Sequence, residues 1–146
     1  MSGRVPREFV DTNVFVYAHD RSAGAKQAQA RRLIDRLFAS GTGCLSVQVL
    51  QEVFVTLTRK VPRPLDEAAA EAVIETLSSW RAFEPRVGSV FSAIGLERRL
   101  GIAFWDAMIL HAAAELECEI VWSEDLKAGQ AYDGVTVRNP FAAAEA

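Results

Sequence analysis

The chain has 146 residues and a mass of 16.0 kDa, the usual size of a single folded domain. Half of the residues are hydrophobic and 24% are charged, a balance that excludes a disordered or fibrous protein. The formal net charge of −3 does not indicate a nucleic-acid-binding protein. It does not argue against one either, since committing four carboxylates to a metal ion would leave the basic residues in excess.

The cellular setting follows from segments that the sequence lacks. No apolar run approaches the ~20 residues of a membrane span, and the start, "MSGRVPREF", has no apolar segment of the kind found in signal peptides. We therefore expect a cytoplasmic protein without a membrane partner. Cys44 and Cys118 lie among apolar neighbours without metal-ligand spacing, which predicts two reduced, buried thiols.

Short β-rich runs alternate with longer segments of helical period, the pattern of a parallel sheet built from βαβ units. The expected strands cover residues 7–11, 43–46, 82–85, 118–123 and 134–140, and the expected helices cover residues 25–40, 47–60, 65–80, 87–101 and 103–117. Ser46 is expected to cap the helix that follows it, and prolines stop that helix in "VPRP". We expect one domain over residues 1–146, with a frayed tail at about 141–146.

Two acids are expected at one edge of this sheet. Asp11 lies where the first strand ends, and Asp125 lies just past the fourth predicted strand. Open α/β sheets bind ligands outside the carboxyl ends of their strands. An equally good interpretation of Asp11 alone is a cap for a following helix, a role that aspartate performs well.

Two more acids lie inside helical segments without a local basic partner. Glu52 lies beside Val53 in an apolar stretch. Asp106 lies three residues before Ile109, so the two share one face of a helix. Asp106 alone could instead complement the helix dipole in a first turn. A carboxylate among apolar residues is costly unless it is protonated, paired or bound to a cation. Several such acids meeting at one sheet edge favour the cation.

Oxygen ligands without histidine or cysteine select Mg²⁺ or Mn²⁺ rather than zinc. His19 and His111 are the only histidines, too few for a histidine-rich metal site. In a phosphodiester-cleaving site, such an ion lowers the pKa of a bound water to make the nucleophile, and an ion stabilises the leaving oxygen.

The sequence resembles a known protein family. The matching pieces are "VDTNVFVYAHD", "LSVQVLQEVFVTLTRK", "GIAFWDAMILHAAAELEC", "IVWSEDLKAGQ" and "VRNPF". In their order and spacing they resemble the PIN-domain nucleases and, within them, the VapC-like toxins of bacterial toxin–antitoxin (VapBC) pairs. The resemblance implies a three-layer α/β/α fold with a short, mostly parallel central sheet of four to five strands.

The resemblance also implies the site residues. The family's four catalytic and metal-binding acids fall on Asp11, Glu52, Asp106 and Asp125. Thr12 and Asn13 match the polar pair after the first acid, which would orient ligands or water. Ser123 matches the hydroxyl two residues before the fourth acid. Glu124 is an alternative fourth acid, and the spacing favours Asp125.

By resemblance, the activity is a Mg²⁺- or Mn²⁺-dependent endoribonuclease that leaves 5′-phosphate and 3′-hydroxyl ends on single-stranded or loop RNA. Candidate RNA phosphate contacts are Arg59, Lys60, Arg63, Arg98, Arg99 and Lys127, although a solvated helix end is the favoured interpretation of each. Toxins of this kind form homodimers and are silenced by a small antitoxin. The apolar segments 53–61 and 73–80, the latter with Trp80, are candidates for a dimer or antitoxin surface, although core packing is the favoured explanation for most of them.

The sequence bears on four rival interpretations of its function. An aspartate-phosphorylating phosphatase needs an acid two residues after Asp11, where Asn13 stands, and a phosphoacceptor signalling domain needs adjacent acids after the first strand. A non-catalytic PIN-fold binding protein predicts weakened acids, whereas the set is intact. A PIN nuclease of RNA processing or decay remains open as an alternative to the toxin.

Overall fold

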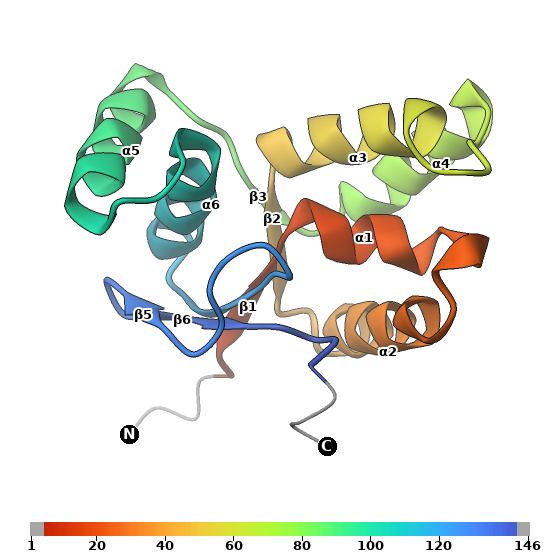
Figure 1. Ribbon diagram of the computed structural model, residues 1–146, viewed down its shortest axis with the longest axis horizontal. Coiled ribbons are helices and arrows are strands. Elements are labelled where there is room, and N and C mark those ends of the chain that lie inside the picture. The colour runs from red at the N-terminus through yellow and green to blue at the C-terminus, as the bar shows by residue number, and fades with distance from the viewer. Residues whose placement is uncertain (1–4, 143–146) are drawn as a thin grey trace.

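The computed structural model describes residues 5–142 and contains a six-stranded sheet in the order β3-β2-β1-β4-β6-β5 (Figure 1). The strands are β1 (Arg7–Val10), β2 (Gly43–Ser46), β3 (Arg81–Phe83), β4 (Cys118–Trp122), β5 (Ala131–Tyr132) and β6 (Val135–Arg138). All neighbouring strands pair in parallel except β5 and β6. The predicted α/β class with a mostly parallel sheet is confirmed.

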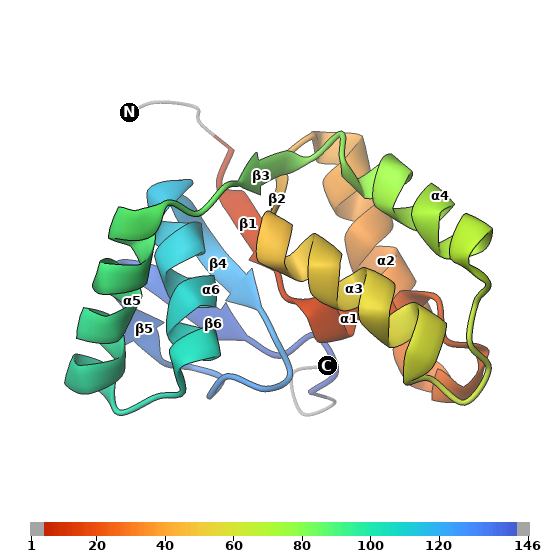
Figure 2. The same ribbon diagram turned by 90° about the horizontal axis from the view of Figure 1, so that it is seen from above.

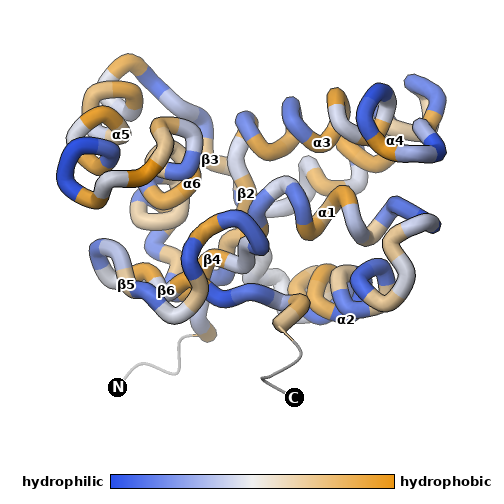
Figure 3. The backbone as a smooth tube through the Cα atoms, viewed as in Figure 1, coloured by the Kyte–Doolittle hydropathy of each residue, from blue (hydrophilic) through white to orange (hydrophobic). Residues whose placement is uncertain are grey.

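Helices cover both faces of this sheet. They are α1 (Thr12–Ala18), the 3₁₀ turn η1 (Arg21–Ala23), α2 (Ala25–Ser40), α3 (Val47–Arg59), α4 (Glu67–Leu77), α5 (Val87–Leu100) and α6 (Phe104–Glu115). Seen from above, the α5–α6 pair lies on one side of β1 and β4, and α1 to α4 lie on the other (Figure 2). Figure 3 shows hydrophobic and hydrophilic positions alternating along α3, the pattern of a helix with one face packed inward.

The strand order places a crevice between β1 and β4. From β1 the chain moves outward through β2 and β3, then crosses back to place β4 on the other side of β1. This is the topological switch point at which open α/β sheets bind ligands. The carboxyl ends of β1 and β4 there are joined by a hydrogen bond of 2.9 Å from the Asp11 amide to the Trp122 carbonyl.

Three elements were not predicted: α1, the 3₁₀ turn η1 and β5. Helix α1 begins directly after β1, because the Asp11 side chain accepts a hydrogen bond from the Thr12 amide at 2.7 Å and so caps it. Strand β5 exceeds the predicted four to five strands and forms a hairpin with β6. Asp133 and Gly134 turn this hairpin with φ of 51° and 85°, the left-handed backbone that suits a two-residue hairpin loop.

Other predictions can be compared with single side chains. Ser46 caps α3 by accepting a hydrogen bond from the Val49 amide at 3.2 Å, as expected. Cys44 and Cys118 are buried and free of disulfides, also as expected. Residues 143–146 of the predicted frayed tail lie outside the described residues, whereas the Phe141 ring packs edge-on against another aromatic ring at 5.0 Å.

Trp80 belongs to the core rather than to an exposed surface. Its ring lies 5.4 Å from that of Phe15 and 5.1 Å from that of Phe38, and the side chain is buried. A Cβ atom on Gly43 would come within 2.6 Å of the Trp80 ring, so only glycine fits beneath it. The part of the predicted docking surface that depended on Trp80 is therefore wrong, and core packing is the correct alternative at this position.

An ion pair between a buried carboxylate and a half-exposed arginine connects β1 to α2. Glu8 on β1 accepts two hydrogen bonds from Arg36 at 2.8 and 3.1 Å and one from the Trp122 indole at 2.7 Å. Burial alone would raise the pKa of Glu8, but the bonds from Arg36 and Trp122 outweigh it and lower the pKa below its ordinary value. Within residues 5–142, no helix is long and apolar enough to cross a membrane.

We expect Glu8→Gln to lower the free energy of unfolding by about 1–2 kcal/mol at pH 7, because a charge-assisted pair is lost while the half-exposed Arg36 can return to solvent. Since the folded-state pKa of Glu8 is lowered, its contribution is present above its ordinary value of 4.5 and fades as the pH falls through the folded-state pKa. Urea unfolding of both proteins between pH 3.5 and 7 measures this. A constant difference across that range would contradict the pairing.

Candidate functional site

The four predicted acids lie around one cavity of about 470 Å³ at the switch point. They come from four places in the chain: the end of β1, the middle of α3, the first turn of α6 and the loop after β4. In that order they are Asp11, Glu52, Asp106 and Asp125. Residues separated by more than a hundred positions in sequence thus face one space.

Asp11 is fixed at the bottom of this cavity. Its carboxylate is only 6% exposed and accepts hydrogen bonds from the Thr12 amide at 2.7 Å and the Ser123 hydroxyl at 2.8 Å. The Ser123 oxygen in turn accepts bonds from the amides of Asp125 at 3.1 Å and Leu126 at 3.2 Å. The buried hydroxyl therefore joins the first acid to the loop that carries the fourth.

Thr12 joins the first acid to the second. Its hydroxyl donates to Glu52 at 2.6 Å, and the Gln48 amide donates to the other oxygen of Glu52 at 3.4 Å. Sequence reasoning assigned no role to Gln48. The signal was present, because residues four apart on a helix lie on the same face.

Asn13 holds the loop after β4. Its side-chain amide donates to Asp125 at 3.0 Å, and its oxygen accepts from the Glu124 backbone amide at 3.3 Å. Asp125 is exposed at the rim of the cavity. The polar pair after the first acid thus contacts two of the three other acid-bearing segments, Thr12 reaching α3 and Asn13 reaching the β4 loop.

Glu124 is occupied elsewhere. The Tyr17 hydroxyl donates to it at 2.7 Å, and Lys26 forms an ion pair with it while lying over the rings of Tyr17 and Phe141. Burial tends to raise the pKa of Glu124, but these two partners lower it overall. Glu124 does not line the cavity, whereas Asp125 does. Sequence reasoning did not anticipate this use of Tyr17 and Lys26.

The acids raise one another's affinity for a proton. Burial first, and then the nearby charges of Asp125 and Glu52, raise the pKa of Asp11 from 3.8 to about 6, although its two hydrogen bonds oppose the shift. Burial and the same two charges raise the pKa of Asp106. Asp106 makes no hydrogen bond or ion pair with any residue in 5–142. Negative charge thus accumulates in this cavity beyond what protein groups neutralise.

The donor set fits a hard divalent cation. Carboxylates without histidine or cysteine are the ligands that Mg²⁺ and Mn²⁺ prefer, and removing the repulsion between them is what such an ion would do. Within residues 5–142, no three acidic, histidine or cysteine side chains already stand close enough to hold an ion. Binding would therefore require the carboxylates to rotate toward the centre of the cavity.

The predicted RNA contacts are dispersed. Lys60 lines the cavity, and Arg59 and Arg63 are exposed on either side of it in sequence. Arg99 pairs with Asp133 at 2.8 Å. The remaining two, Arg98 and Lys127, are exposed. Of the six, Lys60 is thus the one that lines the cavity with the acids.

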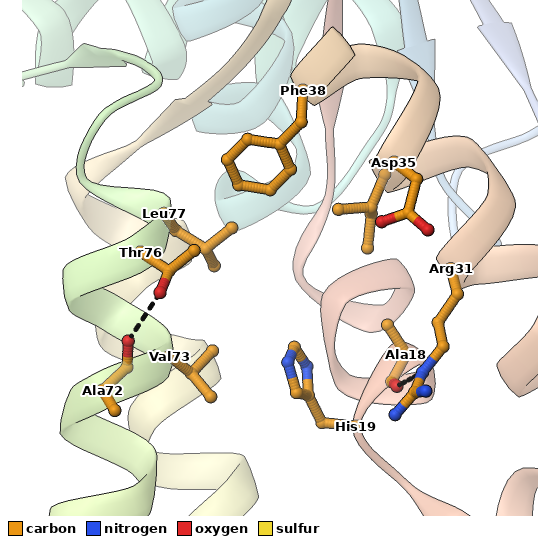
Figure 4. Close-up of a pocket in the computed structure, with 10 residues that line it drawn as sticks. Ala18, His19, Arg31, Asp35, Phe38, Ala72, Val73, Thr76 and Leu77 are labelled. Carbon is orange, nitrogen blue, oxygen red and sulfur yellow. Dashed lines mark hydrogen bonds between the residues drawn. The ribbon is translucent and has the colours of Figure 1, made fainter.

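Two other hollows lie away from the acids. One, of about 380 Å³, lies between α2 and α4 near the end of α1, where Arg31 donates to the Ala18 carbonyl at 2.8 Å (Figure 4). The other is a largely apolar groove of about 610 Å³ between α3 and α4. It is lined by Leu50, Gln51, Phe54, Val55, Glu67, Glu71 and Ile74. We call it the α3–α4 groove; it includes parts of both predicted docking segments.

The PIN domain family model matches residues 9–133, so the chain belongs to the PIN domain family. That range includes all four acids. A comparison with curated proteins found no match.

Solved structures with the same fold come from toxin–antitoxin systems. VapC20 of Mycobacterium tuberculosis, described as a toxin that cleaves the sarcin–ricin loop, is 21% identical with a TM-score of 0.62, over 81% of this chain and 89% of that one. A toxin–antitoxin complex from Klebsiella pneumoniae gives 16% identity and a TM-score of 0.69, over 92% and 98%. VapBC2 of Rickettsia felis, bound to a DNA fragment from its promoter, gives 18% and 0.60, over 90% and 97%. At these identities the likeness is one of fold.

We expect Mn²⁺ or Mg²⁺ at saturating concentration to raise the melting temperature by several degrees at pH 7.5, since an ion at a hundred times its Kd adds about 2.7 kcal/mol. The rise should be smaller at pH 5, because protons compete for Asp11, whose pKa is about 6. Differential scanning fluorimetry measures both. Asp11→Asn should lose the rise and Asp35→Asn, on exposed α2 surface, should keep it. An equal rise in all three proteins would place the ion elsewhere.

Proposed function

We propose that this protein is a metal-dependent endoribonuclease and the toxin of a toxin–antitoxin pair. The observation that carries the proposal is the convergence of Asp11, Glu52, Asp106 and Asp125 on one cavity at the switch point of a PIN fold. Among the described residues, no serine, cysteine or histidine lines this cavity, which favours hydrolysis by a metal-activated water over attack by a base-activated hydroxyl or thiol.

The four acids would hold Mg²⁺ or Mn²⁺, which supplies an activated water and stabilises charge on the leaving oxygen of a phosphodiester. Other groups of the chain hold these acids in position. Ser123 and the Thr12 amide keep both oxygens of Asp11 in place, Thr12 orients Glu52, and Asn13 orients Asp125. Lys60, at the cavity wall, is placed to attract the RNA backbone.

Loop or single-stranded RNA is the proposed substrate. VapC20, which shares the fold, is described as cleaving an RNA loop. Unpaired loops offer splayed bases that a protein can read, whereas the deep groove of duplex RNA does not admit side chains.

A small antitoxin is the proposed partner, and a homodimer the proposed assembly. Two of the similar structures are described as complexes of a toxin with its antitoxin or as a VapBC pair. The α3–α4 groove offers apolar residues to such a partner on the helix that also carries Glu52.

We expect Asp11→Asn and Asp106→Asn to reduce kcat for RNA cleavage by more than about 100-fold, because even the outer partners of metal ligands cost about 10- to 100-fold when removed. Cleavage of labelled RNA with Mg²⁺ or Mn²⁺ measures this, with Asp35→Asn as the control that should retain activity. Full cleavage in EDTA would contradict the metal mechanism.

Growth arrest on expression should follow cleavage across the same variants. We expect wild type and Asp35→Asn to stop growth, and Asp11→Asn to be tolerated at equal protein level. Metal-dependent cleavage without growth arrest would move the protein to RNA processing or decay.

Phe54→Ala should weaken antitoxin binding about tenfold while leaving RNA cleavage unchanged, because Phe54 lines the α3–α4 groove and not the acidic cavity. Calorimetry with the antitoxin encoded beside this gene measures the affinity. Val87→Ala, on exposed α5 surface, is the matched control. Unchanged affinity for Phe54→Ala would remove the groove from the interface.

A further inference from the structure

Trp105 is exposed at the rim of the acidic cavity. Six large hydrophobic side chains are exposed among residues 5–142: Val5, Phe38, Val87, Val90, Phe91 and Trp105. Trp105 is the one of these six that lines the cavity. An exposed tryptophan beside a functional cavity indicates a ligand-binding role, because burying its large apolar surface against a ligand is more favourable than leaving that surface in water.

The indole has a defined position. Phe104 lies edge-on to it, with ring centroids 5.1 Å apart and planes at 78°. Phe104 itself packs against a small buried cluster of Ala93, Ala107 and Met108. The exposed ring is therefore supported from beneath by the α5–α6 core, which limits the entropy that it would lose on binding a flat ligand.

The charge around the ring selects what kind of contact it can make. Trp105 is adjacent in sequence to Asp106, and four further acids line the cavity: Asp11, Asp20, Glu52 and Asp125. A metal ion on these acids and Lys60 would attract the phosphate, so the neutral ring of Trp105 would add affinity through the uncharged part of a nucleotide. Stacking on an aromatic ring provides such affinity, because every base has a π face.

We propose that Trp105 is a base-stacking platform that binds the nucleotide next to the cleaved phosphodiester. This inference rests on the proposed ribonuclease function and adds a specificity residue to it. Trp105 and Asp106 line the same cavity, so a base on Trp105 would belong to a nucleotide at the acidic site. The contact requires an unpaired base, which restricts substrates to loops and single strands.

Steady-state kinetics on an RNA hairpin that the wild type cleaves tests the proposal. Trp105→Ala should raise KM about 5- to 150-fold with little change in kcat, which corresponds to the usual loss of one base–aromatic stack. Trp105→Phe should recover most of the loss, because a stacking ring remains. Phe91→Ala, which removes another exposed aromatic ring outside the cavity, should keep the wild-type KM.

Tryptophan fluorescence distinguishes base stacking from a purely structural role of Trp105, because only stacking would quench its emission. Of the three tryptophans, Trp80 is buried, Trp122 donates its indole N–H to Glu8, and Trp105 is exposed. A polyadenosine oligonucleotide should quench the wild-type emission, and Trp105→Phe should show no quenching while still binding in an anisotropy titration.

The outcomes separate the two proposals. Cleavage by Trp105→Ala with wild-type KM would overturn the stacking role and leave the ribonuclease standing. Loss of a dimer in Trp105→Ala by light scattering, without a change in KM, would also overturn it and assign the ring to a second copy of the chain. A wild-type protein that neither binds nor cleaves RNA would overturn both.

Discussion

The buried carboxylate of Asp11 is the constraint around which the rest of the molecule is organised. A charge this far from water is tolerated only with partners, and the protein gives it two hydrogen-bond donors but no cation. The other acids make its position less favourable still. The fold holds this arrangement because Asp11 directly follows the fully buried Phe9 and Val10 of the central strand β1, so its only opening is the cavity.

Hydrogen bonds connect the segments that meet at the switch point. From the β1–α1 junction, Thr12 reaches α3 and Asn13 reaches the loop after β4. Lys26 and Tyr17 keep Glu124 out of the cavity, so that loop presents Asp125 alone. The α1 turn is therefore the hub of the site, and the acids on other elements are arranged around it.

Much of this architecture could be predicted from residue patterns. Alternating β and helical segments indicate a parallel sheet, and unpaired acids in apolar surroundings mark the cavity. Short elements escaped detection: α1 has seven residues and depends on the Asp11 cap, and β5 has two and depends on the Asp133–Gly134 turn. Trp80, Tyr17 and Lys26 could not be placed, because their partners lie far away in sequence.

The long sequence separation within the site has a consequence during translation. Ser123 donates to Asp11, and Asp125 accepts from Asn13. Both Ser123 and Asp125 follow β4, and each lies 112 positions after its partner. A nascent chain still lacking β4 has no neighbour for β1 on that side and no cap on the cavity. The acidic centre is thus completed only after residue 125 has been synthesised, so a shorter chain on the ribosome carries an incomplete set of acids.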